Sequence, residues 1–268
     1  MLKDSTRVQY VDKWFDGDET GSGFANAVFT RLIAKERRFM RIDFRYAVFD
    51  GCYLRSCVFD SCDFTGCRFV ASNLHGSKFP GCKFDYATFD RTDIDSEVLD
   101  ESCPPFDNLK ARFARTLRTN YQQLGDSAGV NKAISIELRA MENHLHKAWH
   151  SNESYYRKKY AGVKRFEMWA KWVGFNFSDF VWGNGESPLK LVRTMLLVLV
   201  AMALVDAFVW PCAEYAGFLQ ALISAPQILL GTKTPTAFPG WYLSFVVALR
   251  LVAFALFTSV LIKRFSRR

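Results

Sequence analysis

The sequence predicts a multidomain protein in which a square β-solenoid is followed by an α-helical hairpin and two transmembrane helices flanking a short re-entrant helix. Three observations carry this prediction. Large apolar residues recur at every fifth position from residue 39 to 99, two helical apolar stripes follow them, and two long apolar runs lie near the C-terminus. A chain of 268 residues, half of them apolar, is long enough for more than one domain.

The five-residue repeat is carried mainly by phenylalanine. All nine Phe residues between positions 39 and 99 share one register. A period of five matches neither the helix nor the strand, but it matches a coil with four sides of five residues each, whose large residues point inward. The predicted core residues are Phe39, Phe44, Phe49, Leu54, Phe59, Phe64, Phe69, Leu74, Phe79, Phe84 and Phe89.

A column of small residues lies two positions before each large one and contains five of the seven cysteines. These cysteines follow the repeat and form no CxxC pair, so we predict that they pack as small apolar residues and bind no metal. Weaker copies of the repeat at Phe24 and Phe29 extend the array to about residue 22. Residues 1–21 are then an N-terminal cap segment.

The pattern over residues 22–102 resembles the pentapeptide-repeat family, which implies a right-handed quadrilateral β-helix. Some members of that family are acidic DNA mimics that bind topoisomerases. Residues 1–100 carry 14 basic and 16 acidic residues, and arginines such as Arg41 and Arg55 occupy outward positions. This near balance argues against a DNA mimic, and we expect no nucleic-acid partner.

The apolar pattern of residues 107–162 predicts a cytosolic helical hairpin that caps the solenoid. The first apolar stripe runs from Leu109 to Leu124 with Asp107 as its expected N-cap, and residues 125–127 form the turn before the second stripe. On the second helix Glu142, His146 and His150 share one face. No fourth ligand is evident, so a solvated polar face is favoured over a zinc site. Without a nucleophile–base pair, a phosphate loop or paired catalytic carboxylates, we predict no enzyme and no cofactor.

Residues 163–188 combine aromatic side chains with Lys164, Arg165 and Lys171, a composition typical of a helix in the membrane interface. A core helix of a soluble domain is the alternative. The predicted pore-like domain, residues 189–268, follows with apolar spans at about 191–212 and 241–262. Basic residues precede the first span and follow the second, so the positive-inside rule places both termini in the cytoplasm of a multi-pass protein. We expect a bacterial-type inner (plasma) membrane for the spans and, with no evident signal peptide, a reducing cytosol for the repeat array.

Between the spans, residues 218–230 are apolar but too few to cross a bilayer, which indicates a re-entrant helix. A filter or constriction is expected just after it. Span, re-entrant helix and span together resemble the two-transmembrane pore-loop channels of the potassium-channel class. The sequence departs from their TVGYG signature, of which only the glycine is retained. The predicted pore residues are Leu229, Leu230, Gly231, Thr232 and Lys233.

Asp206 is the one charged residue from Thr194 to Cys212 and Arg250 the one from Trp241 to Ile262, and we expect them to pair, either to orient the spans or to line a conduction path. Two helices cannot enclose a channel, so a pore requires a homo-oligomer in the bilayer, for which we expect a tetramer. The sequence therefore favours an oligomeric ion channel with a cytosolic β-helix that senses or binds a protein partner. The alternative is a membrane-tethered interaction scaffold that does not conduct.

Overall fold

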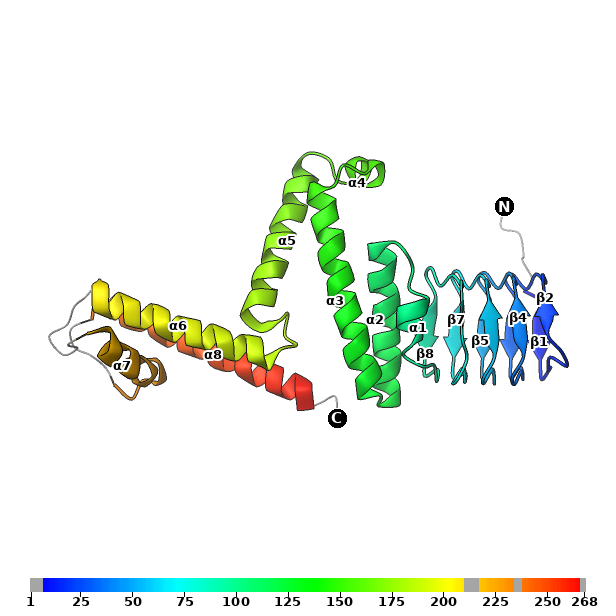
Figure 1. Ribbon diagram of the computed structural model, residues 1–268, viewed down its shortest axis with the longest axis horizontal. Helices are drawn as coiled ribbons and strands as arrows, with labels where there is room; N and C mark the ends of the chain where they lie inside the picture. Colours follow the sequence, from blue (N-terminus) through cyan, green and yellow to red (C-terminus); the bar gives the residue numbers. More distant parts are fainter. Residues whose placement is uncertain (1–6, 210–216, 234–237, 266–268) are drawn as a thin grey trace. The chain divides into compact units, whose positions relative to one another are not determined.

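The computed structural model describes residues 7–209, 217–233 and 238–265. The chain divides into two compact units, Met1–Trp169 and Ala170–Arg268. The first contains a β-solenoid and helices α1 to α4, and the second contains α6 to α8, while α5 (Val163–Trp182) crosses the division (Figure 1).

Two parallel sheets form two sides of the solenoid, and successive strands within each sheet come from successive coils. Beyond the first coil, strands of neighbouring coils are 20 residues apart, so Phe29 pairs with Phe49 and Phe49 with Phe69. This offset is four units of five residues. The larger sheet has β1 (Gln9–Val11), β3 (Val28–Thr30), β5 (Val48–Asp50), β7 (Arg68–Val70) and β8 (Thr88–Asp90), and the smaller has β2 (Glu19–Thr20), β4 (Arg38–Met40) and β6 (Val58–Asp60).

The other two sides are held by single parallel bridges. One ladder runs from Ile33 through Tyr53 to Asn73, and the other from Asp43 through Asp63 to Lys83. The corners between sides adopt left-handed backbone conformations at every fifth residue from Asn26 to Arg91. Gly66 illustrates the constraint, because a Cβ at this corner would lie 2.5 Å from the Tyr46 ring of the preceding coil.

The solenoid interior is a set of stacked aromatic rings. All eleven predicted core residues are buried. Within a column each ring lies nearly parallel to the ring one coil later: Phe49 and Phe69 have centroids 4.8 Å apart, and Phe44 and Phe64 are 5.1 Å apart. This spacing matches the separation of the hydrogen-bonded strands, so ring stacking and backbone pairing reinforce each other.

The small-residue column supplies hydrogen-bond donors to the interior. The Cys67 thiol donates to the carbonyl of Phe44 across 2.8 Å, and the Ser77 hydroxyl donates to Leu54 O across 2.7 Å, each 23 residues earlier. Cys and Ser therefore interchange because either satisfies a buried carbonyl. Burial raises the pKa of the Cys52 thiol to about 11, which keeps it a protonated donor. No cluster of metal-ligating side chains occurs among the described residues.

The solenoid begins earlier than residue 22. Strand β1 pairs Tyr10 with Phe29, and the Phe15 ring contacts Phe39 at 5.0 Å, so residues of the expected cap segment already form a coil. Sequence periodicity missed this coil because the core positions change from Phe15 to Glu19, a step of four residues instead of five. The slip moves Tyr10 and Phe15 out of the common register.

Helices α1 (Val98–Glu101) and α2 (Asp107–Leu124) follow the last coil, and α2 closes it. Phe113 packs against Phe84 and Phe89, with centroids 5.5 and 6.0 Å away. The Asn120 amide accepts from the backbone N–H of Thr92 and donates to its carbonyl, both at 2.7 Å. Thr116 and Gln123 accept the backbone N–H groups of Phe89 in β8 and of Arg91 just after it. The side chains of α2 thus satisfy a strand edge that would otherwise remain open.

Helix α3 (Ser127–His150) packs along α2, and its first turn is capped by Asp126. Asp107 is the first residue of α2 and not its N-cap; its carboxylate instead binds Lys147 Nζ at 2.7 Å. Helix α4 (Ser154–Lys159) then folds against the end of α3. Glu142, His146 and His150 are exposed, which agrees with a solvated face.

We predict that Asn120→Ala destabilises the full-length protein by about 2–4 kcal/mol, because it leaves both the N–H and the carbonyl of Thr92 buried and unsatisfied. Denaturant unfolding followed by circular dichroism measures this change. The control, Asn143→Ala on the exposed face of α3, should change stability by less than about 0.5 kcal/mol. Equal stability of the two variants would show that α2 does not hold the solenoid end in this way.

Candidate functional site

Helix α5 carries a stripe of exposed aromatic side chains along one face, comprising Phe166, Trp169, Phe177 and Phe180. Their successive spacings of three, eight and three residues place them on one side of the helix. Gly183–Ser187 then form a turn in which the Ser187 hydroxyl accepts the backbone N–H of Lys190 and begins α6 (Pro188–Phe208). Pro188 occupies the first turn of α6, where its missing N–H costs nothing.

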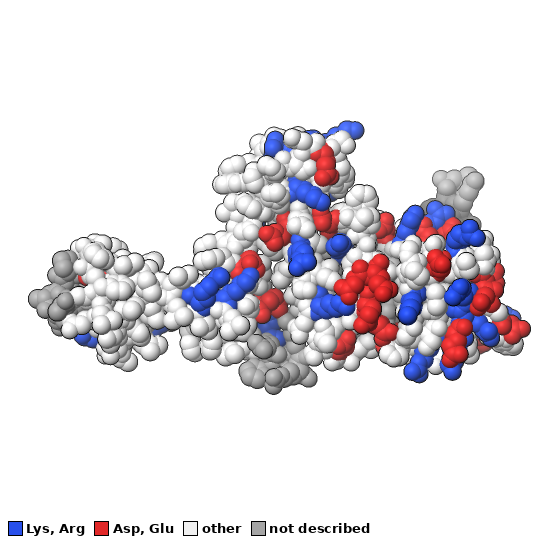
Figure 2. Space-filling view, in the orientation of Figure 1, with Lys and Arg blue, Asp and Glu red and all other residues white. Residues whose placement is uncertain are grey.

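Helices α6 and α8 (Gly240–Phe265) are both long and apolar enough to cross a membrane, with mean hydropathies of 2.2 and 2.5. Only 22% of the apolar window of α6 and 11% of that of α8 are buried. Large apolar side chains such as Leu196, Leu251 and Phe254 are exposed instead. On the face drawn in Figure 2 this part of the surface is almost free of charge. The end of the predicted first span, residues 210–212, lies outside the described residues.

A third apolar helix, α7 (Phe218–Leu230), occupies the predicted re-entrant segment and is too short to cross a bilayer. It packs against α6 and α8, which lie side by side (Figure 1). The three helices share a small buried core. Its members are Met202, Ala225, Ile228, Leu229, Phe238, Tyr242 and Val246.

The predicted pore residues form the C-terminal cap of α7. Leu229 is buried and Leu230 is exposed. Gly231 adopts a left-handed conformation with φ of 79°, and the N–H of Thr232 donates back to Gln227 O at 2.9 Å. The backbone of Lys233 also donates to Gln227 O, at 3.2 Å. This arrangement ends the helix through a glycine cap.

Arg250 of α8 holds the end of α7. Its Nη1 donates to Leu230 O at 3.0 Å, and a Cβ on Gly231 would collide with the guanidinium. A cation beside the last carbonyls of a helix is favoured by the helix dipole. Glycine is therefore required at position 231 for two reasons: its left-handed backbone conformation and the close approach of Arg250.

Asp206 binds Tyr242 and not Arg250. The Tyr242 hydroxyl donates to Asp206 Oδ1 at 3.2 Å, Asp206 is only 1% exposed, and its Oδ2 has no partner among the described residues. The expected pairing of Asp206 with Arg250 is thus replaced by two contacts, one to Tyr242 and one to the end of α7. Sequence reasoning missed Tyr242, whose phenolic hydroxyl near the start of the second apolar run was an available donor.

Charged residues gather where α6 begins and α8 ends. Lys190 Nζ binds Asp179 Oδ2 at 2.6 Å, and Lys263 near the end of α8 pairs with Glu186 just before α6. Arg193 lies 4.4 Å from the centroid of the Phe180 ring. These pairs place the N-terminal end of α6 and the C-terminal end of α8 at the same end of the unit.

Comparison with known proteins concerns the solenoid. A family model described as pentapeptide repeats matches residues 38–76 and 62–95, with eight copies. The segment is a pentapeptide-repeat solenoid. A solved structure of QnrB1, a plasmid-mediated fluoroquinolone resistance protein, is 19% identical to this chain with a TM-score of 0.12, and the match covers 33% of this chain and 54% of that one. The chain thus spans about half the length of that structure. No curated protein matches the sequence.

We predict that Asp206→Asn and Tyr242→Phe are energetically coupled by about 0.5–3 kcal/mol, whereas Asp206→Asn and Arg250→Gln are additive. Asp206 and Tyr242 share a hydrogen bond, while Asp206 and Arg250 share no partner in the described part of the chain. Thermal unfolding of single and double variants in detergent measures both couplings. Rescue of Asp206→Asn by Arg250→Gln would contradict these contacts and support direct pairing.

Proposed function

We propose that the protein is an oligomeric ion channel in which α6 and α8 span the membrane, α7 is a re-entrant pore helix and the pentapeptide-repeat solenoid lies in the cytosol. The observation that carries the proposal is the packing of a short apolar helix with a glycine cap between two long apolar helices. In a bilayer, such a helix ending at mid-depth is tolerated only where protein or water satisfies its terminal carbonyls.

The exposed apolar surface of α6 and α8 supports a membrane location. A core helix of a soluble domain would be mostly buried, whereas these helices bury 22% and 11% of their apolar windows. Lipid, neighbouring copies or both would cover the rest. The aromatic stripe of α5 with its adjacent lysines has the composition of an interfacial helix leading into the first span.

The charged end of the unit supports a cytoplasmic location for both termini. Lys190 and Arg193 stand at the start of α6, and Lys263 stands near the end of α8. Because the positive-inside rule places such residues in the cytoplasm, the solenoid and its helical cap lie on the same side. The mixed charge of the solenoid surface (Figure 2) suits contact with a cytosolic protein partner.

The end of α7 favours a pore without potassium selectivity. The filter carbonyls of potassium channels face the ion, whereas here the last carbonyl of α7 accepts a hydrogen bond from Arg250. Lys233 adds a second positive charge two residues after Gly231. Two cations near the constriction would disfavour cation entry electrostatically.

A membrane-tethered interaction scaffold is the second candidate. The absence of the TVGYG signature favours it, since a scaffold needs only the two spans as an anchor. In that case α7 and its contacts with Arg250 serve to pack the spans together.

We predict flux through full-length protein in liposomes that does not favour potassium over sodium and falls at least about tenfold in Gly231→Leu, because the leucine side chain would displace Arg250 from the end of α7. Potassium, sodium and chloride gradients are tested separately. The control is Gly174→Leu, at a helical glycine with open space around its Cβ position, and it should leave flux unchanged.

Lack of flux from wild-type protein that is correctly oligomeric would favour the scaffold. Strong potassium selectivity would instead retain the channel but contradict the role given to Arg250 and Lys233. Equal loss in Gly231→Leu and Gly174→Leu would show that the end of α7 is not part of the pore.

A further inference from the structure

The first unit contains a cavity of about 490 Å³ where the last coil of the solenoid meets the helical hairpin. The turn at Asp85–Tyr86, the start of α2, the end of α3 and the start of α4 each contribute to its lining. This volume lies in the range of small-molecule sites, about 300–1,000 Å³. Among the described residues, none of those that line the cavity comes from α6, α7 or α8.

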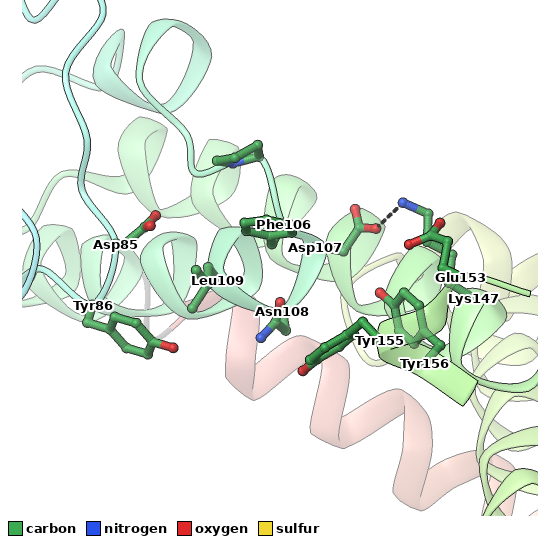
Figure 3. A pocket seen from close by; sticks show the side chains of 11 residues that line it. Asp85, Tyr86, Phe106, Asp107, Asn108, Leu109, Lys147, Glu153, Tyr155 and Tyr156 are labelled. Atoms are coloured by element: carbon green, nitrogen blue, oxygen red, sulfur yellow. Dashed lines mark hydrogen bonds and ion pairs between the residues drawn. The ribbon is translucent and has the colours of Figure 1, made fainter. Parts of the chain in front are cut away.

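The cavity has aromatic walls (Figure 3). Tyr86 comes from the solenoid, Phe106 from the segment before α2, and Tyr155 and Tyr156 from α4. Phe106 is 63% exposed, although it is a large apolar residue. The rings of Tyr86 and Tyr155 already attract cations, because Arg112 and Lys159 each lie 5.3 Å from a ring centroid. Aromatic faces of this kind bind ammonium groups.

The cavity lining is negatively charged. It contains three carboxylates and one lysine, and the lysine, Lys147, is neutralised by Asp107 at 2.7 Å. The other two carboxylates, Asp85 and Glu153, have no ion pair or side-chain hydrogen bond to any described residue. The pKa of Tyr156 is raised to about 12, first by burial and then by the negative charges of Asp107 and Glu153 nearby.

In Figure 3 the two unpaired carboxylates lie at opposite ends of the cavity, and the Phe106 ring, Leu109 and the Asp107–Lys147 ion pair lie between them. An acidic group at each end, with the apolar side chains of Phe106 and Leu109 on part of the wall between them, matches a molecule with two separated positive charges and an alkyl chain. A metal ion would need several oxygen ligands around one point, an arrangement that this separation does not provide.

We propose that this cavity binds an aliphatic diamine or polyamine. One ammonium group forms a charge-assisted hydrogen bond with Asp85 and the other with Glu153, while the methylene chain lies on Phe106 and Leu109. The Tyr86 and Tyr155 rings add cation–π attraction at the two ends. The site lies in the solenoid-and-hairpin unit, and the proposal holds whether or not the second unit conducts ions.

The test is isothermal titration calorimetry of the full-length protein in an uncharged detergent with a series of α,ω-diaminoalkanes of increasing length. We expect binding with an optimum chain length set by the separation of Asp85 and Glu153. Butylamine, which has one charge, should bind at least about tenfold more weakly than the best diamine, and 1,4-butanediol should not bind detectably.

Asp85→Asn and Glu153→Gln should each weaken binding of the best diamine about tenfold or more, and the double variant should bind no better than butylamine binds the wild type. Matched controls are Asp93→Asn on another side of the same coil and Glu142→Gln on the exposed face of α3, which should bind as the wild type does. Tyr155→Ala, a third variant that leaves both carboxylates in place, should weaken binding several-fold.

Three results would overturn the proposal. The first is absence of diamine binding, and the second is equal affinity for butylamine and the diamines. The third is unchanged affinity in both carboxylate variants. Binding of a triarginine peptide without binding of any diamine would assign the cavity to a basic protein partner and would show that the ligand class is wrong.

Discussion

The stacking of each solenoid ring on the ring 20 residues later is the contact on which the first unit depends. It accompanies a constant coil length beyond the first coil, where rings such as Phe49 and Phe69 stack at 4.8 Å and the four sides between them contribute five residues each. Backbone pairing, the left-handed corners and the donors of the small-residue column all repeat at intervals set by this register. The repeating stack contains nothing that ends it, so another element must cover the final coil. Helix α2 covers it through Phe113 and Asn120.

The second unit faces a different constraint, since its long helices leave most of their apolar surface uncovered. In water this surface would be an aggregation hazard, whereas in lipid it is the expected outer face of a membrane protein. Polar groups within the unit are accordingly few, and the contacts of Asp206 with Tyr242 and of Arg250 with Leu230 satisfy them in part. Both contacts involve α8, which is thereby linked to α6 through Tyr242 and to the end of α7 through Arg250.

The solenoid core could be predicted well from the sequence, because the five-residue spacing of the Phe residues shows directly which positions point inward. The prediction failed at the first coil, where the four-residue step at Phe15 breaks the period while the pairing of Tyr10 with Phe29 continues. The bounds of α7 were also predictable, since they coincide with the apolar run and its terminal glycine. Side-chain partners within the second unit were not, because hydropathy locates an apolar helix without saying which face meets its neighbours. The cavity could not be predicted from the sequence for a similar reason. Asp85 and Glu153 line one cavity only because the hairpin packs on the solenoid.

The proposed channel requires copies of this chain to assemble around a pore, since two spans and one short helix cannot enclose a path for ions alone. The most direct test is native mass spectrometry of the full-length protein released from detergent micelles, which measures the number of copies in one assembly. We predict a closed oligomer, with four copies expected, as the main species. A monomer as the only species would contradict the pore and leave the two spans as an anchor for the solenoid.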